Sequence, residues 1–168
     1  MRTIKRLLLL LLVLAACVGC DQTTKRLAES NLPRGQALSL LAGTVRLQLA
    51  HNEGAFLGLG VSMPKAWRLA ALRGGVAAML VALLAYALCA NAVGAPLMLA
   101  LSLVFAGGFS NLIDRFVNDG YVVDFLNLGI GSLRTGIFNV ADIAITVGAL
   151  LLFAPNRRSL QTEDRPSN

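Results

Sequence analysis

Acidic and amide side chains stand in apolar stretches of this sequence, where polar groups are costly. Asp142 lies within the apolar run 137–154, and an aspartate near a bilayer centre costs about 2.5 to 3.5 kcal/mol on insertion scales. Asn139 precedes Asp142 by three residues, so both share one helical face. Asp124 has apolar neighbours on both sides, a setting that a solvated loop acid does not need. These acids predict a functional site, and both hydrolysis by paired carboxylates and ion relay would use such groups.

A second polar stripe lies on the preceding apolar run. Gly107, Asn111 and Asp114 follow the spacing i, i+4, i+7, which places them on one face of a helix. The two stripes can therefore meet inside a helix bundle. An alternative is that Asn111 and Asn139, or Asp114 and Arg115, only hold helices together through hydrogen bonds worth about 0.6 to 2 kcal/mol each.

The composition places these stripes in a membrane protein. Hydrophobic residues make up 56% of the 168 positions and charged residues only 14%, which is wrong for a soluble domain. The net charge of +6 comes from basic residues scattered in small groups between apolar runs, which argues against a nucleic-acid partner. One histidine and three cysteines leave little from which to build a metal site, a Ser-His-Asp triad or a disulfide scaffold.

The apolar runs predict an all-α membrane protein with four transmembrane helices. We expect spans at about 7–27, 69–90, 96–114 and 137–154, in one domain over residues 1–156 followed by a polar cytoplasmic tail at 157–168. The alternation at 45–49 predicts a small extracytoplasmic β element between the first two helices. Basic residues before the first run place both termini in the cytoplasm.

The first run has two interpretations. Its uncharged part, 7–20, is short against the ~20 residues that a span requires, and 14–17 has the pattern of a lipoprotein cleavage site. The chain could therefore be a lipoprotein that is matured at Cys17. If the helix continues through the polar stretch 21–25, it is long enough to be retained as a span.

Five motifs in order resemble those of the lipoprotein signal peptidases, the signal peptidase II family. They are DQTTK (21–25), NEGAF (52–56), GGFSNLIDR (107–115), VVDF (122–125) and FNVAD (138–142). Any one alone is weak, whereas five in this order are specific. Because 21–25 belongs to the set, we expect the first run to be a retained helix.

The resemblance implies an aspartic peptidase of the bacterial inner membrane. It would cleave prolipoproteins just before their diacylglyceryl-modified cysteine, near the outer face, as a monomer in contact with membrane lipid and without metal or cofactor. Asp124 and Asp142 would be the catalytic pair. By the same resemblance, the substrate-binding or supporting residues would be Asp21, Lys25, Asn52, Gly54, Gly107, Asn111, Asp114, Arg115, Val123, Asn139 and Ala141.

Elementary chemistry is compatible with this implication. Two carboxylates held close in a poorly solvated site share a proton, so one can act as base and the other as acid. The rival from the transport class is a small proton-coupled carrier, whose acids should spread through the depth of the membrane. In the expected topology the acids gather on one side, which favours a reaction centre at the membrane surface.

Overall fold

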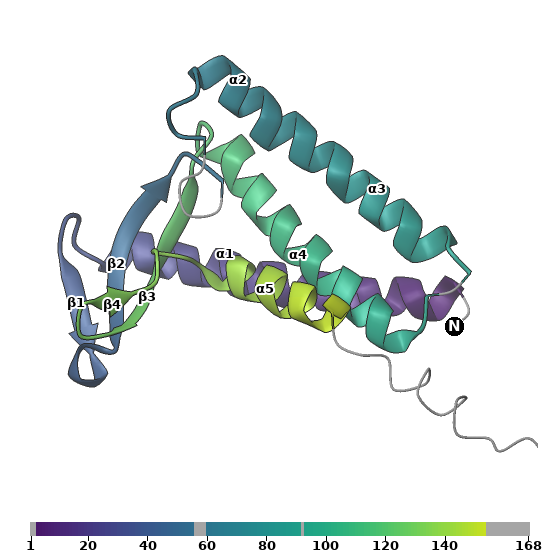
Figure 1. Cartoon of the computed structure of the whole chain (residues 1–168), viewed down its shortest axis with the longest axis horizontal. Helices are drawn as coiled ribbons and strands as arrows, with labels where there is room; N and C mark the ends of the chain where they lie inside the picture. The colour runs from purple at the N-terminus through teal and green to yellow at the C-terminus, as the bar shows by residue number, and fades with distance from the viewer. Residues whose placement is uncertain (1–2, 56–59, 92, 154–168) are drawn as a thin grey trace, which may run out of the picture.

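A bundle of helices carries an antiparallel sheet at one end (Figure 1). The computed structural model describes residues 3–55, 60–91 and 93–153. The order of elements is α1 (Thr3–Asn31), β1 (Ala37–Leu40), β2 (Val45–Asn52), α2 (Lys65–Leu69), α3 (Val76–Cys89), α4 (Ala95–Val117), β3 (Val122–Ile130), β4 (Leu133–Arg134) and α5 (Val140–Phe153). A π-helical turn at Ala70–Gly75 joins α2 to α3, so Lys65–Cys89 runs as one helix.

Helix α4 is the centre of the bundle. It packs against α1, α3 and α5, and 56% of its most apolar stretch is buried. The corresponding stretches of α1 and of Lys65–Cys89 are only 17% and 11% buried. Since these outer faces carry leucine, valine and methionine, they are suited to lipid rather than to water.

Two parts of the predicted fold are wrong. The expectation of four transmembrane helices is overturned because only three helices in the described residues are long and apolar enough to cross a membrane: Thr3–Asn31, Lys65–Cys89 and Ala95–Val117. The fourth predicted span, 137–154, contains a helix of 14 residues, Val140–Phe153. At 1.5 Å per residue this helix is about 21 Å long, against a hydrocarbon core of about 30 Å.

The shortening of α5 has a local cause. Phe138 pairs with Leu126 of β3 in an isolated antiparallel bridge, so the chain is still extended there and the helix begins only at Val140. Residue 154 and the predicted tail at 157–168 lie outside the described residues.

The second error concerns the β structure. The fold is not all-α with one small β element, because the structure contains a four-stranded antiparallel sheet in the order β1-β2-β3-β4. Strands β3 and β4 come from the link between α4 and α5, and Ala50, His51 and Asn52 pair with Asp124, Val123 and Val122. The alternating pattern indicated only β2, since the first half of β3 is buried and its apolar residues do not alternate with polar ones.

Two glycines bring the sheet and the helices together: Gly120 in the turn between α4 and β3, and Gly107 at the contact between α4 and α5. After α4 the chain turns through Gly120, whose φ of +106° lies in the left-handed region that favours glycine. This turn leads directly into β3, so the backbone N–H of Val123 reaches a carboxylate oxygen of Asp114. Gly107 lets α4 approach α5 so closely that an added Cβ would overlap the backbone oxygen of Ala141.

Candidate active site

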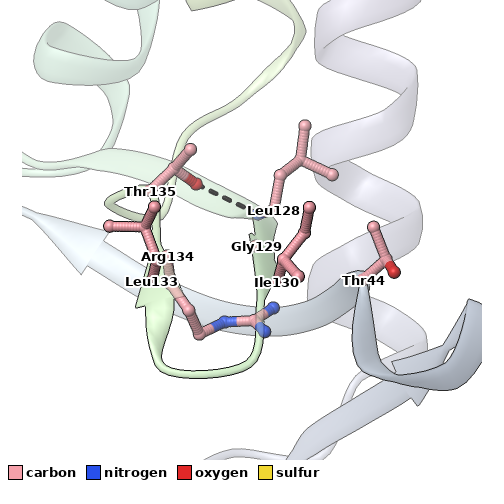
Figure 2. A pocket seen from close by; sticks show the side chains of 7 residues that line it. All are labelled: Thr44, Leu128, Gly129, Ile130, Leu133, Arg134 and Thr135. Atoms are coloured by element: carbon pink, nitrogen blue, oxygen red, sulfur yellow. Dashed lines mark hydrogen bonds between the residues drawn. The ribbon is translucent and has the colours of Figure 1, made fainter.

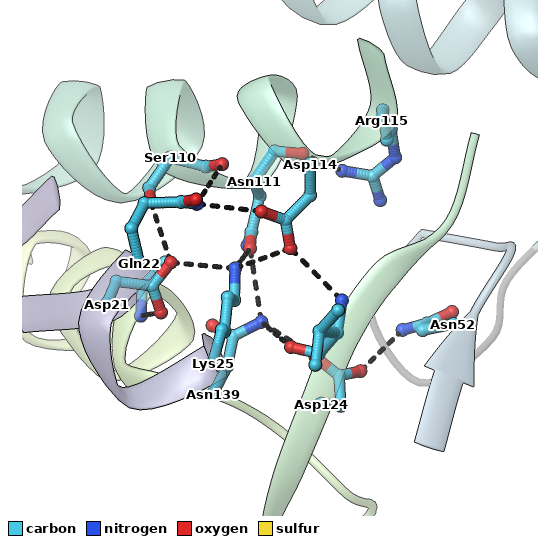
Figure 3. A network of polar contacts seen from close by, with 12 residues as sticks. Asp21, Gln22, Lys25, Asn52, Ser110, Asn111, Asp114, Arg115, Asp124 and Asn139 are labelled. Atoms are coloured by element: carbon cyan, nitrogen blue, oxygen red, sulfur yellow. Dashed lines mark hydrogen bonds and ion pairs between the residues drawn. The ribbon is translucent and has the colours of Figure 1, made fainter. Parts of the chain in front are cut away.

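The predicted site residues converge where the sheet meets α1, α4 and α5 (Figure 3). Strand β3 supplies Asp124, the end of β2 supplies Asn52, and the first turn of α5 supplies Asp142. Helix α4 contributes Asn111, Asp114 and Arg115, and helix α1 contributes Asp21 and Lys25. Polar groups from five separate elements therefore surround one point in the fold.

Asp124 is almost fully buried, with 2% of its surface exposed. Its Oδ2 accepts a hydrogen bond from Nδ2 of Asn52 at 3.0 Å, and its Oδ1 accepts one from Nδ2 of Asn139 at 2.7 Å. Burial and, to a smaller extent, the charge of Asp142 together raise the pKa of the Asp124 carboxyl to about 7, against the lowering effect of the two asparagines. A proton is therefore available at this position near neutral pH.

Asp142 is fixed by the way α5 begins. The backbone N–H of Asp142 donates to Oδ1 of Asn139 at 2.9 Å, while the N–H of Asn139 donates to Oδ2 of Asp142 at 3.2 Å. This reciprocal pair is a capping box, which satisfies amides that a helix start leaves unpaired. Nδ2 of Asn111 donates to the other oxygen, Oδ1, at 2.9 Å. The helix start and α4 thus both orient this carboxylate.

Asn139 connects the two acids. It is fully buried, and its Nδ2 lies 2.7 Å from Oδ1 of Asp124 and 3.1 Å from Oδ1 of Asn111. Asp124 and Asp142 also line the same cavity, which has a volume of about 760 Å³. The arrangement presents two carboxylates to one space, as acid–base hydrolysis requires.

The cavity combines a few polar groups with a mostly apolar lining. Besides the two aspartates, its polar lining includes Asn52, Asn111 and Arg115. The apolar lining comes mainly from two helical segments, Lys65–Cys89 and α5, and includes Leu72, Val76, Met79, Ile143, Val147 and Leu150. Such a space suits a ligand with a polar reacting group and a long apolar part.

The loop after β2 is attached to α4 at this site. The N–H of Gly54 donates to Oδ1 of Asn52 at 3.0 Å, and the guanidinium of Arg115 donates to the Gly54 oxygen at 2.9 Å. Arg115 is buried and makes no salt bridge among the described residues, and its Nε has no partner there. The alternative in which Asp114 and Arg115 form a structural pair does not apply to the described residues, because the ion pair of Asp114 is with Lys25.

Two further predicted site residues, Val123 and Ala141, join the polar network through backbone hydrogen bonds. The N–H of Val123 donates to Asp114 and its carbonyl accepts from Asn139, whereas the N–H of Ala141 donates to Asp21. Gly107 supplies the space that lets α4 approach α5.

Two residues of the network were not predicted as site residues. Gln22 donates to Oδ1 of Asp114 at 2.7 Å, and Ser110 donates to Oδ2 of Asp21 at 2.7 Å. The sequence spacing could have indicated Ser110, because it lies three residues after Gly107 and four before Asp114 on the same helical face.

A second hollow lies at the far end of the sheet (Figure 2). It is lined by Thr44 and by residues 128–130 and 133–135 of β3, β4 and their flanks, with an almost entirely apolar surface. None of the predicted site residues reaches it. The candidate active site is therefore the cavity between the helices.

Fold and site together define a helical membrane protein with a buried polar centre of paired carboxylates beneath a small sheet. The chain belongs to the signal peptidase (SPase) II family, whose sequence profile matches residues 13–155. The resemblance seen in the sequence is thereby confirmed, and the protein is a membrane peptidase.

Curated relatives and solved structures agree with this assignment. The chain is 34% identical over 156 residues to a lipoprotein signal peptidase of Rhodococcus jostii (strain RHA1), covering 89% of this chain and 73% of the relative. It is 35% identical over 148 residues to the lipoprotein signal peptidase of Sulfurihydrogenibium sp. (strain YO3AOP1), covering 88% and 90%. A bacterial membrane enzyme structure obtained by the in meso method at 2.3 Å resolution matches with a TM-score of 0.77 and 26% identity, covering 95% of this chain and 93% of the other.

Proposed function

We propose that this protein removes signal peptides from prolipoproteins by an aspartic mechanism in which Asp124 and Asp142 are the catalytic residues. The family and the lipoprotein signal peptidases among its relatives support the substrate class. The observation that carries the mechanism is that both carboxylates line one cavity and are joined through the same asparagine.

The pair would work by sharing one proton. A pKa near 7 at Asp124, beside a second carboxylate, lets the pair hold one proton and one negative charge at neutral pH. The ionised carboxylate takes a proton from a water molecule while the oxygen of that water attacks the scissile carbonyl carbon. The protonated member donates a hydrogen bond to the developing oxyanion. When the C–N bond breaks, the carboxyl that took the proton from water gives it to the leaving amine, which restores the pair with one shared proton. This route needs no covalent intermediate.

The apolar walls of the cavity support a substrate that carries acyl chains. Leu72, Val76, Met79, Ile143, Val147 and Leu150 line the same cavity as the two carboxylates. Each methylene group that moves from water into such a space contributes about 0.8 kcal/mol. A diacylglyceryl group lodged there would place the amide before the modified cysteine next to Asp124 and Asp142, so the lipid rather than the peptide sequence would select the bond.

The orientation in the membrane follows from charge. Arg2, Lys5 and Arg6 lie at the N-terminal end of the chain, around the start of α1, and positive charge at this end of the first span favours the cytoplasm. The sheet lies at the opposite end of α1 from its N-terminus (Figure 1). Asp124 lies on β3 of this sheet, and the turn of α5 that holds Asp142 is bonded to Asp21, in the second half of α1. We therefore place the active site near the outer face of the inner membrane.

The direct test is cleavage of a diacylglyceryl-modified precursor peptide by the purified protein in detergent. Asp124→Asn and Asp142→Asn should each lower kcat by about 10²- to 10⁴-fold, the usual contribution of an acid–base group. Asp119→Asn is the matched control, since Asp119 lies in the same link and is paired with Lys65 at the surface. Full activity in either site variant would remove that aspartate from the proposed pair, and equal cleavage of an unmodified peptide would argue against selection by the lipid.

A further inference from the structure

One buried ammonium group lies behind the two proposed catalytic residues. Lys25 of α1 is 2% exposed, and its Nζ lies 2.7 Å from Oδ2 of Asp21 and 2.9 Å from Oδ2 of Asp114. It also donates to Oδ1 of Asn111 at 2.9 Å. Each of the three N–H donors of the ammonium therefore has a partner, all of them buried.

The two carboxylates that flank Lys25 hold the chain next to the catalytic pair. Oδ1 of Asp21 accepts from the N–H of Ala141 at 2.9 Å, and Oδ2 of Asp114 accepts from the N–H of Val123 at 3.1 Å. Ala141 immediately precedes Asp142 and Val123 immediately precedes Asp124. Figure 3 shows the acidic groups and Lys25 on the bundle side of Asp124. The backbones of α5 and β3 are thus both tied to one ammonium.

The third contact of Lys25 reaches the pair through a side chain. Because the oxygen of Asn111 faces the ammonium, its Nδ2 faces Oδ1 of Asp142, to which it donates at 2.9 Å. The same oxygen accepts from Nδ2 of Asn139, which also donates to Asp124. A positive charge at Lys25 therefore favours the orientation in which both asparagines present donors to the carboxylates.

We propose that Lys25 is a positioning residue that sets the distance and orientation between Asp124 and Asp142 through Asp21, Asp114 and Asn111. The inference rests on the proposed function, because it takes these two aspartates as the hydrolytic pair. A lysine that only balanced buried charge would be replaceable by any change that restored that balance. A positioning lysine would not, because its three directed contacts would still be missing.

The test therefore removes the ammonium without changing the net charge of the cluster. Lys25→Met alone leaves two buried carboxylates without a counter-ion, which is strongly destabilising. In Lys25→Met/Asp21→Asn and in Lys25→Met/Asp114→Asn, one charge of each sign is lost, and the new amide oxygen can still accept the Ala141 or Val123 N–H. We expect both double variants to keep a thermal unfolding transition in detergent and to lose about 100-fold in kcat with KM unchanged, as for a small misplacement of reacting groups.

The matched control removes an exposed ion pair of the same chemistry. Lys65 and Asp119 lie 2.8 Å apart with 59% and 79% of their side chains exposed. Lys65→Met/Asp119→Asn should leave both kcat and the unfolding transition as in the wild type, since exposed pairs contribute little.

The outcomes separate this inference from the proposed function. Wild-type kcat in a folded double variant would overturn the positioning role, and so would loss of the folded state in both double variants. In either case the proposed function stands as long as Asp124→Asn and Asp142→Asn are inactive. Activity in those single variants would remove the proposed pair itself, whatever the double variants do.

Discussion

Nδ2 of Asn139 donates to Oδ1 of Asp124 at 2.7 Å, and the backbone N–H of the same residue donates to Asp142 at 3.2 Å. One residue thus serves as the N-terminal cap of α5 and as the bridge between two carboxylates on different elements. The start of a helix and the geometry of the proposed catalytic pair are therefore fixed by the same side chain.

The two roles of Asn139 can be separated by substitution. Asn139→Ser keeps an oxygen that can cap α5 but has no amide to reach Asp124, so we expect near wild-type thermal stability and a fall in kcat of about 100-fold. Asn139→Ala loses the cap as well and should be less stable by about 0.5 to 2 kcal/mol. The measurements are precursor cleavage and thermal unfolding in one detergent. Equal activity of Asn139→Ser and wild type would show that the bridge to Asp124 is dispensable.

The pKa of Asp124 predicts how stability depends on pH. Because burial raises this pKa from 3.8 to about 7, the folded protein binds more protons than the unfolded chain between these values, and stability falls as pH rises through this window. Asp124→Asn cannot ionise and lacks this loss. We expect the variant to unfold at a higher temperature than the wild type at pH 8, with the difference shrinking toward pH 4.

The loss of folding stability cannot exceed the value set by the pKa difference of Asp124 between the folded and the unfolded chain, which is about 1.4 kcal/mol for each pKa unit. Thermal unfolding of both proteins across pH 4 to 8 provides the comparison, and Asp119→Asn, an exposed aspartate, serves as the control. Parallel curves for Asp124→Asn and wild type would mean that the Asp124 carboxyl titrates in its ordinary range.

The family and most of the residues that converge were predicted from the resemblance of five ordered motifs to the signal peptidase II family. A smaller set, which includes Asp142 and Asn111, also stood out as polar groups in apolar runs. Asp142 and Asn139 stand three residues apart on a helix, so their proximity followed from helical period. The contact of Lys25 with Asp114 could not be derived in this way, since it joins α1 to α4 and depends on how the helices cross. Only three-dimensional packing selects Lys25 over the adjacent Arg115 as the partner of Asp114.

The errors in the predicted fold also arise because tertiary contacts cannot be read from the sequence. The largely apolar run 137–154 predicted one continuous span, but Phe138 is held in a bridge with Leu126, so the helix is shorter than the apolar run. Strand β3 likewise shows no alternation in its buried half, and its pairing with β2 involves residues far apart in the chain. Apolar runs predict burial, whereas the boundary between strand and helix within them is set by tertiary pairing.

Close packing at Gly107 predicts an effect of a single methyl group. Gly107→Ala would place Cβ against the backbone oxygen of Ala141, which cannot move without shifting Asp142. We expect a loss of about 1 to 3 kcal/mol in stability, together with a lower kcat, because the strain falls between α4 and α5. Gly19→Ala on α1 has nothing within 4 Å of the new Cβ and is the matched control. If Gly107→Ala matched Gly19→Ala in unfolding temperature and turnover, the two helices would have to be further apart than the structure places them.

The apolar walls of the cavity predict an effect on substrate affinity that leaves the chemical step intact. Val147 lines the cavity on α5, whereas Val81 on α3 is 67% exposed and does not line it. Val147→Trp should fill part of the space proposed for the acyl chains. Exclusion of two methylene groups would cost about 1.6 kcal/mol, or about a tenfold rise in KM. Val81→Trp adds the same bulk on an outer face and should leave KM unchanged. The measurement is steady-state cleavage of a diacylated precursor by both variants. A KM that stays at the wild-type value in Val147→Trp would place the acyl chains elsewhere. A fall in kcat alone would mean that the new side chain disturbs Asp142 instead.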